Sequence, residues 1–490
     1  MATLSKLKTS VSVAAKSAII LLVAALAGAG CNQRSPASQG ASVPNDLAIS
    51  VNTLAPEPAT APINSVDPRG DALLATLALS EHPTVPADPT NRFADDARAA
   101  ALGQQIFMDP RFSGRLIEGD NDGSAHTLGK KGEAGKISCA GCHMPEQGFS
   151  DFRTLGGQIS LAAGWGRRRA PSLLDVAQNH FFMWDGRHDT LASQIFSVIE
   201  SPVEMNSSRL YFAQRLYDHY RSDYEAIFGK MPNYGDHKRF PLIPAQVVGC
   251  HFKGRPGLGD CLGPQRGGPG DGAEFDHLSE RDQRATNQTV INAGKAVAAF
   301  ERHLKCGRSR FDEWVAGRSD VLTLSEQRGA RLFVGKARCV SCHSGPYLSD
   351  FDFHNVGMTA KIVAVVFQDG GDRGAATGIA AAQKDPLNSR GKFSDGANSA
   401  LDLPIDAHLE SAFKTPMLRC LSSRPSYMHT GQIRTLSSVV DFFNGGGDRY
   451  GYSGRNELRP LGLTDTEKQD LVAFLRSLEG SHADRIKSGG

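Results

Sequence analysis

Two copies of a five-residue motif constrain this chain more than any other feature of its sequence. The copies are Cys139-Ala140-Gly141-Cys142-His143 and Cys339-Val340-Ser341-Cys342-His343. Two thiols three residues apart can add to the vinyl groups of one haem, and the adjacent histidine then reaches the iron from the same side. A zinc site or a redox dithiol is the rival interpretation, but no thioredoxin-like βαβ pattern surrounds either motif. The sequence therefore predicts two covalently bound haems c, with His143 and His343 as axial ligands of the iron.

The flanks of the two motifs also match, which indicates an internal repeat. A glycine, an aliphatic residue and a phenylalanine recur at the same offsets in residues 102–107 and 328–333. Matching tails follow the motifs, Phe-Ser-Asp-Phe at 149–152 and Leu-Ser-Asp-Phe at 348–351. The first unit has a longer stretch between Phe107 and Cys139, rich in glycine and aspartate, which we expect to form a loop.

The remaining periodicity is helical. Four apolar residues share one helical face, namely Ile291, Val297, Phe300 and Leu304. Thr-Leu-Ser-Glu at 323–326 and Thr-Asp-Thr-Glu at 464–467 are capping boxes that begin helices, and Gly480 is the expected stop of the second. No alternating strand pattern of useful length occurs. We predict a mainly α fold with two cytochrome c-type domains, each with one covalently bound haem.

The first 31 residues are typical of an export signal. Lysines at 6, 8 and 16 precede an apolar run at 18–30, which is shorter than the ~20 residues that a spanning helix needs. Residues 26–31, Leu-Ala-Gly-Ala-Gly-Cys, also resemble a bacterial lipobox, in which Cys31 would carry lipid. Simple cleavage and an uncleaved anchor are the alternatives. Each of them predicts a periplasmic protein, tethered to the membrane as a lipoprotein if Cys31 is modified.

Composition separates a tether from a globular body. Residues 32–90 are rich in Pro, Ala, Ser and Thr, so they are expected to form a disordered tether. Over all 490 residues, 40% are hydrophobic and 22% charged, which is globular composition. The 54 basic and 52 acidic residues leave a net charge of +2, and no basic run is long enough to follow a phosphate backbone. Nucleic acid is therefore not an expected partner.

Seven further stretches resemble one family, the bacterial dihaem cytochrome c peroxidases and MauG, the dihaem enzyme that matures tryptophan tryptophylquinone. They are residues 169–173, 184–187 (Trp-Asp-Gly-Arg), 201–205, 353–357, 413–416, 418–419 and 427–431. They follow the family's order over about residues 95–480. The resemblance implies a peroxidatic haem domain at 91–300, with an insert at about 231–280, and an electron-transfer haem domain at 301–484.

The resemblance also implies catalytic residues. In the family, the haem nearer the N-terminus has an open face that bears a Gln and a Glu, which correspond here to Gln194 and Glu204. A carboxylate beside the iron can move a proton between the two oxygens of peroxide, and an amide can orient the peroxide. A surface carboxylate and a solvated helix residue are the structural alternatives for these two positions. Trp184 corresponds to the family's electron relay between the haems, and it can also be a buried core residue.

Two positions depart from the family's iron ligands. Some peroxidases of the family place a histidine over the N-terminal haem where this chain has Leu161, so we predict a five-coordinate iron that needs no reductive activation. The sixth ligand of the C-terminal haem, Met or Tyr in the family, aligns with Phe443, which has no donor atom. Met428, Tyr450 or Tyr452 could replace it after a local shift, or that iron could be five-coordinate. The sequence does not choose among these.

The family binds calcium between its domains, through an Asn that here is Arg169 and through backbone oxygens that match Arg424 and Ser426. A guanidinium cannot ligate calcium, so a calcium site is doubtful, and our hypothesis is that Arg169 replaces the charge of the ion.

Besides Cys31, four cysteines lie outside the haem motifs. Cys250 and Cys261 lie in the insert, where a disulfide is expected in an oxidising compartment. Cys306 and Cys420 each lie beside a family motif and could form a second bridge.

The resemblance thus implies a periplasmic dihaem c-type peroxidase. It would reduce hydrogen peroxide to water at the N-terminal haem, with electrons that pass through the C-terminal haem from a small cytochrome c or cupredoxin. The first alternative is a MauG-like dihaem oxidase that oxidatively modifies residues of a partner protein. The second is a non-catalytic dihaem electron carrier. Glu204 and the open iron face argue against the carrier, and Leu161 and the missing methionine favour the MauG-like oxidase somewhat.

Overall fold

The computed structural model describes residues 68–151, 153, 159–249, 273–359, 371–422, 424 and 426–480. The predicted export signal with Cys31, most of the predicted tether and the Cys250–Cys261 pair lie outside these residues. Within them, every helix is too short or too polar to cross a bilayer.

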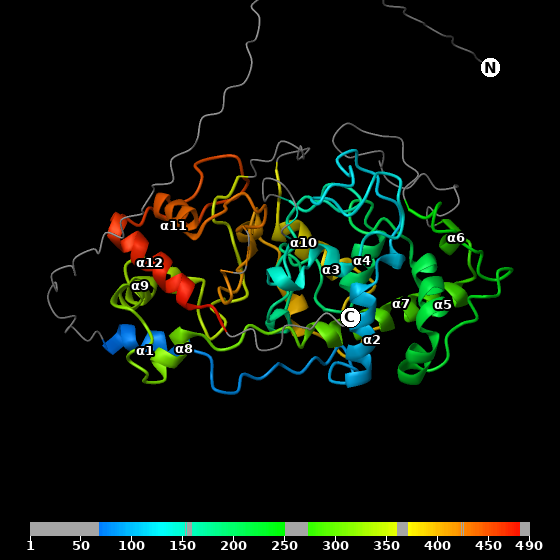
Figure 1. The fold of residues 1–490 in the computed structure, drawn as a ribbon, viewed down its shortest axis with the longest axis horizontal. Helices are drawn as coiled ribbons and strands as arrows, with labels where there is room; N and C mark the ends of the chain where they lie inside the picture. Colours follow the sequence, from blue (N-terminus) through cyan, green and yellow to red (C-terminus); the bar gives the residue numbers. More distant parts are fainter. Residues whose placement is uncertain are drawn as a thin grey trace, which may run out of the picture. The chain divides into compact units, whose positions relative to one another are not determined.

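Helices form nearly all the regular structure of the described chain, which confirms the mainly α prediction (Figure 1). They are α1 (Pro68–Thr76), α2 (Ala97–Met108), α3 (Cys139–Cys142), α4 (Gln194–Glu200), α5 (Arg209–Phe228), α6 (Ala273–Asp276), α7 (Glu280–Glu301), α8 (Arg310–Val315), α9 (Leu324–Val334), α10 (Ala375–Lys384), α11 (Leu436–Gly445) and α12 (Asp465–Ser477). Short 3-10 turns occur at Pro110–Phe112, Pro145–Gln147, Val176–Gln178, Cys339–Ser341, Ser399–Asp402 and Ala407–Leu409. Strands β1 (Phe353–His354) and β2 (Phe413–Lys414) pair antiparallel.

Local signals set the helix ends. The predicted capping boxes are formed at α9, between Thr323 and Glu326, and at α12, between Thr464 and Glu467. Helix α12 ends at Ser477, three residues before Gly480. Between α2 and α3 the chain has only one 3-10 turn, so the predicted loop is confirmed.

Each haem motif follows a helix that crosses a second helix at a glycine. Helix α2 packs against α7, and α9 packs against α12 (Figure 1). A Cβ atom at Gly103 would lie 1.9 Å from the carbonyl oxygen of Ala296, and one at Gly329 would lie 2.0 Å from that of Asp470. The recurring glycine of the sequence repeat is therefore needed for the close approach of two backbones.

These two helix pairs are the centres of two hydrophobic cores. The first core gathers α2, α4, α5 and α7 around fully buried rings such as those of Phe107, Phe112 and Phe212. The second gathers α8, α9, α11 and α12 around Phe311, Phe333 and Phe474. The last part of the predicted tether at 32–90 is not disordered: α1 forms there, and Leu74 and Leu77 are buried in the second core because that core offers them an apolar surface. The other domain boundaries deduced from the sequence stay a prediction.

Covalent and hydrogen-bonded links join distant parts of the chain. Cys306 and Cys420 form a disulfide across 114 residues, which confirms that expectation. The backbone N–H of Lys414, in β2, donates to the carbonyl oxygen of Trp184 at 2.9 Å. A third, smaller core packs Phe181 and Phe353 with α10.

Candidate active site

The two Cys-x-x-Cys-His motifs have nearly the same local geometry. The first motif forms α3, which the Ser138 hydroxyl caps by accepting from the N–H of Gly141 at 3.1 Å. The second motif forms a 3-10 turn that begins after Arg338. The ring of Phe107 lies 6.5 Å from that of His143, and Phe333 lies at the same distance from His343.

A backbone carbonyl orients each histidine. Nδ1 of His143 lies 3.1 Å from the carbonyl oxygen of Phe149, and Nδ1 of His343 lies 2.8 Å from that of Leu348. Phe149 and Leu348 occupy equivalent positions of the repeat, with φ of 53° and 52°. A proton on Nδ1 that is donated to a carbonyl leaves Nε2 with its lone pair, so both rings are set to bind a metal through Nε2.

The surroundings of the first motif fit a haem. Burial raises the pKa of the Cys139 and Cys142 thiols to about 12, and neither cysteine is in a disulfide. Arg153 donates through Nη2 to Cys142 Sγ at 3.4 Å and to Asp151, while its Nε and Nη1 are buried with no hydrogen-bond partner in the described chain. Two buried thiols outside any disulfide are thus available to bond a haem, and the unpaired N–H groups of Arg153 leave hydrogen-bond donors beside the motif.

Glu204 presents an unsatisfied carboxylate oxygen in the same region. Its Oε2 is buried with no hydrogen-bond partner among the described residues, and Oε1 lies 3.9 Å from Nη2 of Arg187. Burial raises the pKa of Glu204, against the attraction of Arg187. The Glu204 side chain as a whole is 36% exposed, so part of it faces open space although Oε2 itself is buried. A carboxyl group in this setting can both accept and return a proton.

Leu161 lies in a segment that runs beside Glu204. The N–H groups of Ala163 and Gly164 donate to the carbonyl oxygens of Glu204 and Val203, at 3.1 and 3.0 Å. Leu161 is buried, and its carbonyl oxygen accepts from Arg153 Nη2 at 3.0 Å. The position that carries a histidine in some relatives therefore brings an apolar side chain here.

Gln194 begins α4 and contacts a residue that the sequence analysis missed. Its Nε2 donates to Oε2 of Glu301 at 3.3 Å. Glu301 ends α7, is 4% exposed, and has a pKa raised to about 8 by burial. The only sequence signal was its position directly after Phe300, on the apolar face of a helix.

Trp184 contacts segments from both halves of the repeat. Its Nε1 donates to the carbonyl oxygen of Arg169 at 2.8 Å, and its ring meets that of His429 edge to face, with centroids 6.4 Å apart. The position suits a relay between the two motifs, which stays a prediction.

Arg169 joins the same two halves. Its Nη1 donates to the carbonyl oxygen of Ser426 at 2.5 Å and to the Ser426 hydroxyl, and its Nη2 donates to the carbonyl oxygen of Asp151 at 2.7 Å. Burial lowers the pKa of Arg169 only to about 10, so the group is a cation at neutral pH. Ser426 is one of the two positions whose backbone oxygens the resemblance assigns to calcium.

The second motif has several donor atoms nearby. His354 lies between Asp350 and Glu457, at 2.9 and 2.7 Å, and within reach of Cys342. Met358, which the sequence analysis did not consider, is buried, and its Sδ accepts from Gln432 Nε2 at 2.9 Å.

The sixth-ligand candidates of the C-terminal haem stay open. Phe443 lies half-buried in α11, and Met428 is also half-buried. Tyr450 is 83% exposed, and Tyr452 donates to the carbonyl oxygen of Asp448 at 2.9 Å.

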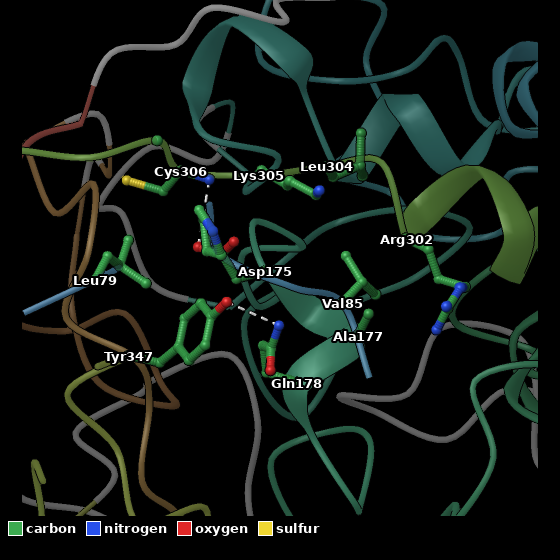
Figure 2. Close-up of a pocket in the computed structure, with 12 residues that line it drawn as sticks. Leu79, Val85, Asp175, Ala177, Gln178, Arg302, Leu304, Lys305, Cys306 and Tyr347 are labelled. Atoms are coloured by element: carbon green, nitrogen blue, oxygen red, sulfur yellow. Dashed lines mark hydrogen bonds between the residues drawn. The ribbon is translucent and has the colours of Figure 1, made fainter. Parts of the chain in front are cut away.

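A separate cavity of about 40 Å³ lies beside the Cys306–Cys420 disulfide (Figure 2). Asp175, Gln178, Tyr347 and Arg302 are among its lining residues, whereas no haem-motif cysteine is. Asp175 accepts from the N–H of Cys306 at 3.3 Å, and Gln178 donates to the Tyr347 hydroxyl at 2.9 Å.

Comparisons with known proteins agree with these motifs. The sequence profile of the family described as di-haem cytochrome c peroxidase matches residues 97–242. The methylamine utilization protein MauG of Methylorubrum extorquens is 30% identical over 387 residues, which cover 78% of each chain. The cytochrome-c peroxidase IdrP1 of Denitromonas iodatirespirans is 28% identical, over 84% of this chain and 88% of its own.

A solved structure shares the fold. The diheme peroxidase BthA from Burkholderia thailandensis superimposes with a TM-score of 0.54 at 21% identity, and the match covers 81% of this chain and 89% of that one. With the identity to MauG over more than two thirds of the chain, the conclusion is direct: this chain belongs to the family of dihaem cytochrome c peroxidases and MauG.

Proposed function

We propose that this oxidoreductase reduces hydrogen peroxide to water at a haem near its N-terminus. Cys139 and Cys142 would bind that haem covalently, with His143 as its axial ligand. A second haem would be held by the other motif, with the cysteines Cys339 and Cys342 and the ligand His343. A small cytochrome c or cupredoxin would supply electrons through the second haem.

The observation that carries the proposal is the carboxyl group of Glu204. Its Oε2 is buried without a hydrogen-bond partner in the described chain, and such an atom costs about 1–3 kcal/mol unless a ligand satisfies it. The segment beside it contributes Leu161, which offers no atom that could bind iron. Peroxide would therefore find a proton acceptor in Glu204 and no competing ligand from Leu161.

The chain's own residues would manage the protons. When bound, the haem supplies the iron at which the O–O bond of peroxide is broken. Glu204 would take a proton from one oxygen and return it to the other, which leaves as water. Over the whole reaction, two electrons and two protons convert one peroxide into two waters. Gln194 would hold the peroxide in line, and Trp184 would carry electrons between the haems.

We also propose that the protein is exported. The predicted export signal would place the protein in the periplasm, and lipidation of Cys31 would hold it at the membrane by the chain that precedes α1.

A MauG-like oxidation of a partner protein is the second candidate. Leu161 and Phe443 favour it, because the first would leave the N-terminal iron open in the resting protein and the second would remove the methionine that raises the potential of the C-terminal haem.

One experiment separates these functions. Peroxide is added to the ferric protein, its spectrum is followed, and reduced cytochrome c is then supplied. Fast oxidation of the cytochrome supports the peroxidase. A long-lived oxidised protein that does not react with cytochrome supports the MauG-like oxidase. An unchanged spectrum would contradict both and leave an electron carrier.

A further inference from the structure

Glu301 is a buried acid that the proposed reaction does not yet use. It is 4% exposed at the C-terminal end of α7, and burial alone raises its pKa to about 8. It is therefore mostly uncharged at neutral pH, which is how a buried carboxyl group without a counter-charge persists.

The charged side chains on the helices around Glu301 form ion pairs with other residues. Arg302 donates to Asp95 at 2.9 Å and to the carbonyl oxygen of Pro86, and Lys295 pairs with Asp395 at 2.8 Å. On α4, Glu200 pairs with Arg209. From α3, the group that acts electrostatically with Glu301 is the thiol of Cys139, which becomes an uncharged thioether once haem is attached.

The packing of α4 on α7 fixes the distance between Glu301 and Gln194. A Cβ atom at Gly294 would lie 2.4 Å from the carbonyl oxygen of Ala192, so the start of α4 rests directly on α7. Ser193, next to Gln194, is 1% exposed and donates to the carbonyl oxygen of Thr190 at 3.2 Å. The backbone at Gln194 is thus held firmly, and its side chain reaches Glu301 Oε2 through Nε2 at 3.3 Å.

We propose that Glu301 is a positioning residue: it holds the Nε2 end of the Gln194 amide, so that the Oε1 end is presented to the proton-bearing ligand at the N-terminal haem. This inference rests on the proposed function, because it assigns Gln194 to the open face of that haem. An amide that is held at its Nε2 end cannot turn over and swap its donor and acceptor ends. Gln194 needs this constraint, because its Oε1 must accept a hydrogen bond from peroxide.

The test uses hydrogen cyanide and the ferric holoprotein. Cyanide, like peroxide, arrives with a proton that it must lose, and its association rate can be followed in the haem spectrum without turnover. We expect Glu301→Leu to slow association about 10-fold, the usual effect of losing an outer-shell partner. Glu301→Gln should keep the wild-type rate, because its amide oxygen can still accept from Gln194 Nε2.

A double-mutant cycle separates positioning from general damage. Gln194→Leu should slow cyanide association by itself, and Glu301→Leu should add nothing in that background. Glu200→Leu is the matched control, since it makes the same chemical change as Glu301→Leu on the helix that carries Gln194 and should leave the rate unchanged.

Three results would overturn the inference. The first is a wild-type rate of cyanide association in Glu301→Leu. The second is that Glu301→Leu slows association as much in the Gln194→Leu background as it does alone. The third is that the control variant slows association by a similar factor. If the wild-type protein binds no cyanide at all, the proposed open haem face fails, and the role of Glu301 fails with it. If the wild-type protein does bind cyanide, the association rates of the variants test the role of Glu301 separately from the proposed function.

Discussion

Arg169 and Ser426 are 257 positions apart in the sequence, yet Nη1 of the arginine donates to the carbonyl oxygen of the serine at 2.5 Å. The same guanidinium holds the carbonyl oxygen of Asp151. A cation thus binds backbone oxygens from the tail of the first haem motif, at Asp151, and from the chain's second half, at Ser426. This supports the hypothesis that Arg169 stands in place of a calcium ion, and the hypothesis can be tested.

We expect the chelator-washed protein to contain no stoichiometric calcium and to keep its melting temperature in EDTA. Arg169→Asn should lower the stability by about 3 kcal/mol or more, because several charged hydrogen bonds are lost at a buried site. Calcium should then restore part of the melting temperature of this variant but not change that of the wild type. Arg98→Asn, at an exposed arginine, is the control. Calcium bound to the washed wild type would refute the hypothesis.

Glu204 should control the reaction with peroxide. Glu204→Gln keeps the size of the side chain but removes its acid–base function, so we expect the rate with peroxide to fall by about 10²–10⁴. Burial raises the pKa of Glu204, and only the ionised form can accept a proton. The wild-type rate should therefore fall as the pH is lowered through that pKa, and the variant should lack this dependence.

Stopped-flow spectra at several pH values measure both effects, with Glu200→Gln as the matched control. An undiminished rate in Glu204→Gln would remove this residue from the proposed chemistry.

The two motifs should differ in function although they are alike in geometry. Replacing Cys139 and Cys142 together by alanine should leave one covalent haem and abolish the response of the spectrum to peroxide. The same change at Cys339 and Cys342 should also leave one haem, keep an initial response to peroxide and stop turnover with cytochrome. The haem content is measured as the pyridine haemochrome. A peroxide response that survives the first double substitution would assign the reaction to the other haem.

Local sequence signals predicted much of this structure. A capping box needs only Thr323 and Glu326, and a close helix crossing needs a glycine such as Gly103, so short patterns are enough to place these features. The haem motifs are equally local, since the carbonyl groups that orient His143 and His343 lie six and five residues further along the chain.

The features that the sequence did not reveal depend on contacts between distant residues. Glu301 lies 107 positions from Gln194, and neither segment contains a sequence pattern that predicts contact with the other. Met358 comes close to Gln432 only because the chain returns after 74 residues. The sequence also did not predict the hydrogen bond from Arg153 to Cys142. Whether the nitrogens of an arginine are paired depends on its burial and its neighbours, which only the structure gives.

The disulfide should contribute strongly to stability. Cys306 and Cys420 are both buried and close a loop of 114 residues, for which the chain-entropy model gives roughly 4–5 kcal/mol. Replacing both by alanine should lower the free energy of unfolding in urea by about that amount. The haem content should not change, since neither cysteine belongs to a haem motif. Equal unfolding midpoints for the variant and the wild type would show that the bridge does not stabilise the fold.

Asp175, in the cavity next to this bridge, should make stability depend on pH (Figure 2). Burial raises its pKa from 3.8 to about 7, against the N–H of Cys306 and the charges of Arg419, Arg424 and Lys305. Above pH of about 4 the unfolded chain ionises Asp175 while the folded chain keeps it protonated. The folded state therefore loses stability as the pH rises from about 4 to about 7, by up to about 4 kcal/mol.

Asp175→Asn should remove this loss. Asparagine tolerates the φ of 57° at this position and its side-chain oxygen can still accept from Cys306, so the variant should be little changed at about pH 4. At about pH 8 it should be more stable than the wild type by up to about 4 kcal/mol. Urea unfolding at the two pH values measures the difference, and Asp320→Asn, at an exposed aspartate, is the control. If the variant gains equally at both pH values, its effect comes from packing, and Asp175 does not titrate as its burial requires.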